Sequence, residues 1–132
     1  MSEGFNIEII NPEKSFLLKE NVSEVVVPAF EGDMGILKDH ISIISFLKPG
    51  IIKVFSGSEE EKFYVEDGIL EFKDNNLSIL TSHIFDLKNI NKDEINNSIS
   101  AAEKELSKDD LDDQKKFLLN NKIEVLKSIS LN

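Results

Sequence analysis

Residues 63–72 read FYVEDGILEF, two short apolar-rich runs on either side of an Asp67-Gly68 pair. From Phe63 to Glu66 apolar and polar side chains follow the period of two that is typical of a β-strand. Asp67-Gly68 is a turn former, because glycine adopts positive φ without steric cost. This stretch therefore predicts two short strands joined by a tight turn.

The same pattern extends over the first two thirds of the chain, from Phe5 to about Asp86. Turn-forming residues separate short apolar segments at close intervals, which is typical of an antiparallel β-sandwich. The sequence predicts about ten antiparallel strands, at residues 5–10, 15–19, 23–28, 35–37, 41–46, 51–56, 62–66, 69–73, 77–81 and 83–86.

After Leu87 the period becomes that of a helix. The apolar residues Ile95, Ile99, Ala102 and Leu106 are spaced as one stripe of a helix. Residues 91–94 fit a variant capping box, with Asn91 as N-cap and Glu94 bonding back to its N–H. This region therefore predicts a first helix that begins just after Asn91.

A second helix follows a turn at residues 107–110. Its acidic first turns and its lysines further on complement the helix dipole. With a short connection, the two helices should form an antiparallel hairpin. We therefore predict a β-sandwich domain at residues 1–87 that folds without the hairpin, and a hairpin at 88–132. The apolar stripe expected for the second helix consists of Leu111, Leu118, Val125, Leu126 and Ile129.

Composition excludes several classes of protein. The 132 residues carry a net charge of −10 and contain no cysteine, and all 15 basic residues are lysines. Disulfide frameworks, thiol nucleophiles and arginine fingers are thereby excluded, and binding to nucleic acid is disfavoured. Residues 1–87 contain seven lysines and 16 acidic residues, a net charge of −9, whereas the residues after 87 contain eight lysines and nine acidic residues. No apolar run is long enough to span a bilayer, and the N-terminus lacks a secretory signal pattern.

The residues that carry chemistry are few. His40 and His83 are about forty residues apart and belong to no metal or catalytic motif. We interpret the acidic runs at 59–61 and 109–113 as a solvated hairpin tip and a helix cap, because the second lacks the glycine and glutamate of a calcium loop. The sequence predicts no catalytic residue, metal or cofactor, and favours a binding or mechanical protein over an enzyme.

Two motifs resemble the epsilon subunit of F-type ATP synthases. Residues 27–40, VPAFEGDMGILKDH, followed by LKPG at 47–50, are similar to that family's V-P-G-x-E-G-x-x-G-I-L-P-G-H and L-K-P-G. Residues 63–72 and 77–80 are similar to F-x-V-x-G-G-x-x-E-V and V-T-V-L. Order and spacing agree from Phe5 to the C-terminus. Two departures stand out: Lys38-Asp39 replaces Pro-Gly, and Asp67 replaces a glycine.

The resemblance implies a ten-stranded sandwich, a helical hairpin and no catalytic residue of its own. It implies a subunit of the central stalk that binds the gamma subunit and the c-ring and couples proton flow to ATP synthesis. The hairpin would rest on the sandwich or extend into the alpha/beta head and block ATP hydrolysis. The expected location is peripheral, on the cytoplasmic face of the bacterial inner membrane.

The resemblance also implies which residues contact partners. The glycine-bounded turn of Glu31, Gly32, Asp33, Met34 and Gly35, with a projecting Met34, is expected to contact the c-ring or gamma, as is His40. For the hairpin, we expect the contacts with the acidic surface of the head to come from Lys115, Lys116, Lys122 and Lys127.

Some relatives bind ATP through an I/L-D-x-x-R-A motif at the first helix. Here residues 90–95 place Asn91 at the acid and Glu94 at the arginine. A carboxylate beside a triphosphate is repulsive, so the sequence predicts no useful ATP binding. A different class, a sandwich that recognises a ligand or carbohydrate and dimerises through the hairpin, is the alternative. It lacks an aromatic platform, with one tyrosine and no tryptophan.

Overall fold

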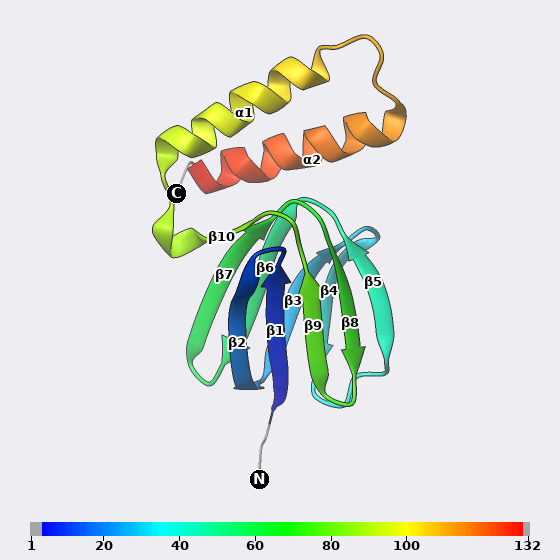
Figure 1. Ribbon diagram of the computed structural model, residues 1–132, viewed down its shortest axis with the longest axis vertical. Coiled ribbons are helices and arrows are strands. Elements are labelled where there is room, and N and C mark those ends of the chain that lie inside the picture. Colours follow the sequence, from blue (N-terminus) through cyan, green and yellow to red (C-terminus); the bar gives the residue numbers. More distant parts are fainter. Residues whose placement is uncertain (1–3, 131–132) are drawn as a thin grey trace.

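The computed structural model describes residues 4–130, apart from the side chain of Lys14, and shows a two-layered β-sandwich with a helical hairpin across one end (Figure 1). One layer contains β3 (Glu24–Ala29), β4 (Gly32–Leu37), β6 (Gly50–Ser56), β7 (Glu59–Val65) and β10 (Ile84–Asp86). The other contains β1 (Phe5–Asn11), β2 (Lys14–Val22), β5 (Ile43–Leu47), β8 (Gly68–Lys73) and β9 (Asn76–Leu80). The predicted fold class is confirmed.

The two layers are joined at one corner, where β3 and β5 share the single pair Ala29–Leu47. Most neighbouring strands are antiparallel, but β1 runs parallel to β9. The expectation of an all-antiparallel sandwich was wrong for this pair. Strands joined by tight turns must be antiparallel, whereas β1 and β9 are separated by seven strands, so no turn fixes their relative direction.

The core lies between the layers and is built from inward-facing side chains of both. Phe5 and Phe72 meet edge to face across β1 and β8, with ring centroids 5.5 Å apart.

Lys19 on β2 forms an ion pair with Glu61 on β7, and this partner raises the pKa of Lys19. The acidic run at 59–61 is therefore part of a strand, and its third residue is ion-paired; the hairpin tip lies at Gly57-Ser58.

A single 3₁₀ turn, η1 (Leu87–Asn89), leads into α1 (Lys92–Leu106). The Asn91 side-chain oxygen accepts hydrogen bonds from the N–H groups of Asp93 and Glu94, at 3.0 and 3.2 Å. The predicted N-cap is confirmed. Asparagine at this position satisfies two of the backbone donors that a helix start leaves unpaired.

The second helix, α2 (Asp113–Ser130), begins later in the chain than the predicted turn at residues 107–110 had indicated. Asp112 caps it by accepting a 2.7 Å hydrogen bond from the Lys115 N–H. Leu111 therefore lies outside the helix, and its predicted place in the helical stripe was wrong. Within α2 the buried side chains are Ile123, Leu126 and Ile129.

The hairpin packs on the sandwich through a second, separate apolar cluster. Its fully buried sandwich member is Tyr64, against which Ile95, Ile99 and Leu126 of the hairpin pack. Tyr64 also stacks at a tilt on Phe85, with centroids 4.9 Å apart. Neither helix is long and apolar enough to cross a membrane, as judged over residues 4–130.

Candidate protein-interaction surface

The predicted contact turn lies between β3 and β4. The turn itself consists of Phe30 and Glu31, and Gly32 follows with φ 137°, a conformation that favours glycine. Met34 does not project from it. Because side chains alternate along a strand, Met34 shares the inward face of β4 with Ile36 and packs against the core.

The other predicted contact residues do not gather at that turn. Asp33 and Gly35 lie exposed along β4. His40 lies beyond the opposite end of this strand, where its ring faces Phe72 edge-on at 5.9 Å and its Nδ1 lies 2.7 Å from the Ile41 carbonyl oxygen. The six residues expected to contact the c-ring or gamma therefore extend from the β3–β4 turn along β4 to a point beyond its far end.

Lys38-Asp39, which replaces the Pro-Gly of the resembled motif, forms a turn braced against the β8–β9 connection. Asp39 has φ 65°, so it adopts the left-handed conformation that glycine favours. Its N–H donates to the Asn75 side-chain oxygen at 2.7 Å, and Asn75 donates back to the Asp39 carboxylate at 2.9 Å. This reciprocal pair supplies the local support for the unusual backbone.

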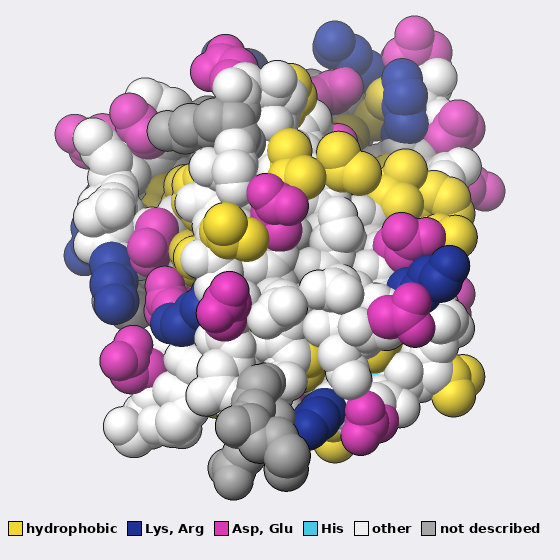
Figure 2. Space-filling view, turned by 60° about the horizontal axis from the view of Figure 1, so that its bottom comes forward, with side chains coloured by type: hydrophobic (Ala, Val, Ile, Leu, Met, Phe, Trp, Pro, Cys, Tyr) yellow, Lys and Arg dark blue, Asp and Glu magenta, His cyan; other side chains and the backbone are white. Residues whose placement is uncertain are grey.

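An exposed apolar row crosses the outer face of the β5–β8–β9–β1 layer. Phe46 is the cross-strand partner of Ile69, Ile69 of Leu80, and Leu80 of Ile10. Phe46, Ile69 and Leu80 expose 59%, 45% and 53% of their surface. Figure 2 shows hydrophobic side chains gathered in a band on the surface of the molecule. Contiguous exposed apolar side chains of this kind mark interaction sites.

Sequence reasoning missed this row, although a signal for it was present. β5 reads Ile43-Ile44-Ser45-Phe46-Leu47, with large apolar side chains on both of its faces. A strand of an antiparallel sandwich with one solvated face should alternate between apolar and polar residues. Apolar residues on both faces therefore indicate that the outer face has a use other than solvation.

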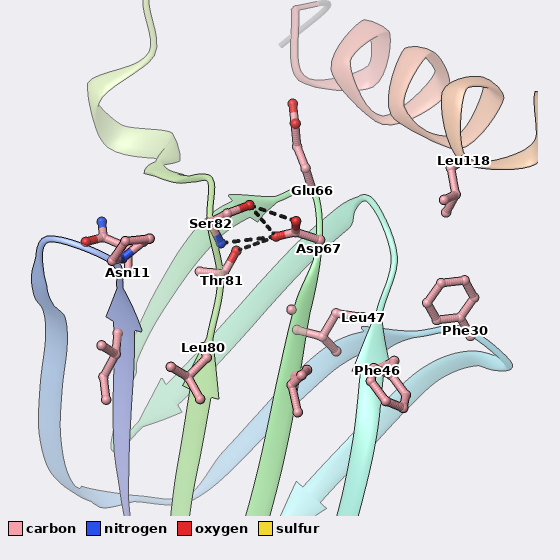
Figure 3. Close-up of a pocket in the computed structure, with 14 residues that line it drawn as sticks. Asn11, Phe30, Phe46, Leu47, Glu66, Asp67, Leu80, Thr81, Ser82 and Leu118 are labelled. Atoms are coloured by element: carbon pink, nitrogen blue, oxygen red, sulfur yellow. Dashed lines mark hydrogen bonds between the residues drawn. The ribbon is translucent and has the colours of Figure 1, made fainter. Parts of the chain in front are cut away.

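A groove of about 640 Å³ lies where the apolar row meets the hairpin. The row forms its floor, Phe30 flanks it, and Leu118 of α2 lies above it (Figure 3). Its apolar lining and size are typical of binding sites. Among its lining residues, the charged ones are Glu66 and Asp67.

Asp67, which replaces a glycine of the resembled motif, joins two loops at the rim of this groove. Its carboxylate accepts hydrogen bonds from the Thr81 hydroxyl at 3.3 Å and from the Ser82 N–H at 3.1 Å (Figure 3). The Ser82 hydroxyl donates to both carboxylate oxygens, at 2.9 and 2.7 Å. Asp67 thus holds the β9–β10 connection against the loop that precedes β8.

The hairpin is held above the groove by polar contacts as well as apolar ones. Lys122 of α2 forms a 2.9 Å ion pair with Glu66, and both side chains are about three-quarters buried. The Tyr64 hydroxyl donates to the same carboxylate at 3.3 Å. Burial, together with the Glu66 charge and hydrogen bond, raises the pKa of Tyr64. One carboxylate therefore connects the sandwich, the tyrosine and α2.

The four lysines expected to contact the head differ in their surroundings. Lys122 is paired with Glu66, and Lys127 lies 3.4 Å from Glu103 of α1. Lys115 and Lys116 are exposed in the first turns of α2. Two of the four are thus engaged within the docked hairpin.

At the position where the resembled ATP-binding motif would lie, Asn91 and Glu94 line a cavity of about 340 Å³ together with Glu66 and His83. Carboxylates here disfavour an anionic ligand, and the Asn91 oxygen is already used as a cap. Over residues 4–130, no three His, Asp or Glu side chains are grouped so that they could hold a metal ion.

Comparisons with known proteins agree with this architecture. Residues 4–86 match the family model of the ATP synthase delta/epsilon chain beta-sandwich domain. The ATP synthase epsilon chain of Pelagibacter ubique (strain HTCC1062) is 65% identical over 130 residues, which covers 98% of this chain and 100% of that one. The epsilon chain of Rhizobium etli (strain CIAT 652) is 38% identical over 107 residues, covering 80% and 78% of the two chains.

Two solved structures share the fold at low sequence identity. A chain of the Euglena gracilis mitochondrial ATP synthase superposes with a TM-score of 0.76 at 18% identity, covering 98% of this chain and 81% of that one. A chain of the Tetrahymena thermophila mitochondrial ATP synthase, from a structure of its central stalk and c-ring, gives 0.64 at 15% identity, with 95% of each chain covered. From the sequence relatives and the matched sandwich, this chain belongs to the family of ATP synthase epsilon chains.

Proposed function

We propose that this chain is a central-stalk subunit that binds the gamma subunit through its apolar row and couples proton flow at the c-ring to ATP synthesis. The observation that carries the proposal is the exposed row on an otherwise well-packed sandwich of an epsilon-family chain. An uncovered row of Phe46, Ile69 and Leu80 is unfavourable in water, and a permanent partner removes that cost. The chain itself then acts as a peripheral part of the complex, at the cytoplasmic face of the bacterial inner membrane.

Contact with the c-ring is assigned to the β3–β4 turn. Glu31 and Asp33 are exposed there, and Phe30 continues the apolar row. Met34 supports the turn from within, and His40, at the far end of β4, contributes to a different surface. The carbohydrate-binding alternative is set aside, because the chain belongs to the epsilon family.

Inhibition of ATP hydrolysis is assigned to an extended hairpin whose lysines meet acidic surface on the alpha/beta head. Lys115 and Lys116 are exposed in the docked hairpin, whereas Lys122 and Lys127 become available when their ion pairs open. Replacing all four with glutamine should relieve inhibition in the assembled enzyme. Hydrolysis that remains equally inhibited would contradict this assignment.

Binding to gamma is tested by placing a charge in the apolar row. Phe46→Asp should lower the affinity of the full chain for purified gamma by at least about a hundredfold, because an unpaired carboxylate would be buried in the interface. The control is Leu37→Asp, on β4 of the other layer and 55% exposed, which should bind as the unaltered chain does. Equal binding by both variants would remove the row from the interface and overturn the proposal.

A further inference from the structure

Among the strands of residues 4–130, three pair with a single neighbour, and β2 is the longest of them. β10 contains three residues and β4 six, whereas β2 contains nine and pairs with β1. An edge strand presents unpaired backbone N–H and C=O groups, to which a strand of another chain can bond. The edge of β2 is therefore the place where a second copy of this chain would most readily add to the sheet.

The pairing of β2 with β1 is irregular at two points. One register shift leaves Phe16 without a directly opposite residue on β1. A second shift follows Lys19 and contains Asn21, whose φ is 58°. Such bulges increase the local twist and interrupt the ladder, which makes an edge less suitable for a further strand. The longest regular stretch that remains is residues 17–19.

Lys19 belongs to this regular stretch and points to the inside of the sandwich. It is directly opposite Ile7, which is fully buried, and directly opposite residues of a ladder share one face of the sheet. Its ammonium group forms the ion pair with Glu61 of β7 in the other layer, and Glu59 lies 3.8 Å away. The Lys19 and Glu61 side chains are 24% and 21% exposed. Water therefore still reaches both charges, at the side of the sandwich where β2 faces β7 (Figure 1).

Next to the ion pair, this side of the sandwich is closed by an apolar contact. Phe16 meets Phe63 of β7 edge to face, with ring centroids 5.6 Å apart. Phe63 follows Glu61 by two residues, so both lie on the inward face of β7. The ion pair therefore places two charges beside an apolar contact, at a border that a further strand would cover.

We propose that the ion pair between Lys19 and Glu61 keeps β2 from pairing with the β2 strand of a second copy, so that the free chain stays monomeric. A ladder between two β2 strands would cover this side of the sandwich and remove water from both charges. The desolvation of a buried ion pair can exceed the attraction between its members. Inward-facing charges on edge strands oppose edge-to-edge pairing for this reason. The inference concerns the chain by itself and does not depend on its binding to gamma.

The direct test removes both charges and leaves the net charge as it is. Lys19→Met/Glu61→Leu introduces apolar side chains of similar size, a replacement that buried ion pairs tolerate without loss of stability. Self-association of the full chain, measured by sedimentation equilibrium, should tighten by at least about tenfold. The matched control Lys127→Met/Glu103→Leu makes the same two substitutions in an ion pair of the hairpin, and should associate no more than the unaltered chain does.

Two results would overturn the proposal. One is equal association of the seam variant and the hairpin control, and the other is an unaltered chain that already dimerises through β2. If Lys19→Met/Glu61→Leu does not unfold cooperatively, Lys19→Gln/Glu61→Gln takes its place, since it also removes both charges and keeps the net charge. The same expected result and the same two contrary results apply to it.

Hydrogen exchange identifies the strand that pairs. In the associated form of Lys19→Met/Glu61→Leu, the amides of β2 should exchange at least about tenfold more slowly than in its monomer. The amides of β4, another edge strand, should exchange at the same rate in both forms. Association that slows exchange in β4 or in the hairpin, and leaves β2 unchanged, would contradict the role of this edge.

Discussion

The sandwich and the hairpin are stabilised on very different scales. Within the sandwich, both layers contribute fully buried side chains such as Ile7, Val25 and Phe72 to one continuous core. Across the boundary with the hairpin, Tyr64 is the fully buried sandwich side chain among the described residues, supported by one ion pair to α2. From this difference we expect that the hairpin can separate from a sandwich that stays folded.

Helix length points the same way. α1 and α2 contain 15 and 18 residues, and helices in proteins gain most of their stability from the packing of an apolar face. Their stability therefore depends on packing against each other and on a surface that covers their apolar stripe. In the docked state that surface is the region around Tyr64; in an extended state a partner must replace it.

The largest expected effect is in the sandwich core. Phe72→Ala should lower the free energy of unfolding of the sandwich by about 3–5 kcal/mol, because it removes a buried ring and leaves a cavity against Phe5. Denaturant titration followed by far-ultraviolet circular dichroism measures this. A loss below about 1 kcal/mol would mean that the core is not the source of stability that the comparison requires.

Next in size is a core residue of the hairpin. Leu126 is 1% exposed. Leu126→Ala should lower the free energy of opening of the hairpin by about 2–4 kcal/mol, while the free energy of unfolding of the strands stays unchanged. Hydrogen exchange separates the two regions. If the strands lost the same free energy as the hairpin, the two would form one cooperative unit and the comparison would fail.

Tyr64 gives the docked hairpin a dependence on alkaline pH. Its pKa is raised by burial in the docked state, so docking is unaffected below the ordinary tyrosine pKa of about 10 and weakens above it, as the exposed phenol loses its proton. The loss should approach about 1.4 kcal/mol for each pH unit. As Tyr64 is the single tyrosine, ultraviolet absorbance follows its ionisation. The variant Tyr64→Phe should abolish this dependence; if it persisted there, another group would be responsible.

The smallest effect expected is that of the polar contact. Lys122→Gln should weaken hairpin docking by about 0.2–1 kcal/mol, because a partly exposed ion pair contributes little beyond its desolvation cost. Added salt should reduce the difference between the variant and the unaltered chain. Lys127→Gln, which breaks a pair inside the hairpin, is the matched control and should leave docking to the sandwich unchanged.

Local sequence signals predicted the elements of this fold well. Asn91 caps α1 as expected, because caps depend on residues close in sequence. Asp67 lies between β7 and β8, but Gly68 is already the first residue of β8, and the two strands belong to different layers. Features set by distant residues were not predicted. The parallel pairing of β1 with β9 is one, and the bond from Lys122 to Glu66 is another.

The surface was predicted less well than the elements. The motif around Glu31 correctly indicated a turn, but it also suggested that Met34 projects from it. Side chains alternate between the two faces of β4, so Met34 points inward and packs against the core. In α2, the apolar residues occupy two neighbouring faces, so Ile123 is buried while Leu118 faces the groove. A single helical stripe could not separate these two roles, because that depends on where the helix docks.

Residue-resolved hydrogen exchange on the full-length chain tests most directly whether the hairpin separates from a folded sandwich. The account predicts two levels of protection under native conditions: amides of α1 and α2 should open with a much smaller free energy than those of β1, β3 and β6, and should do so without them. One common opening free energy for the strands and the helices would contradict it, since the hairpin would then leave only when the sandwich unfolds.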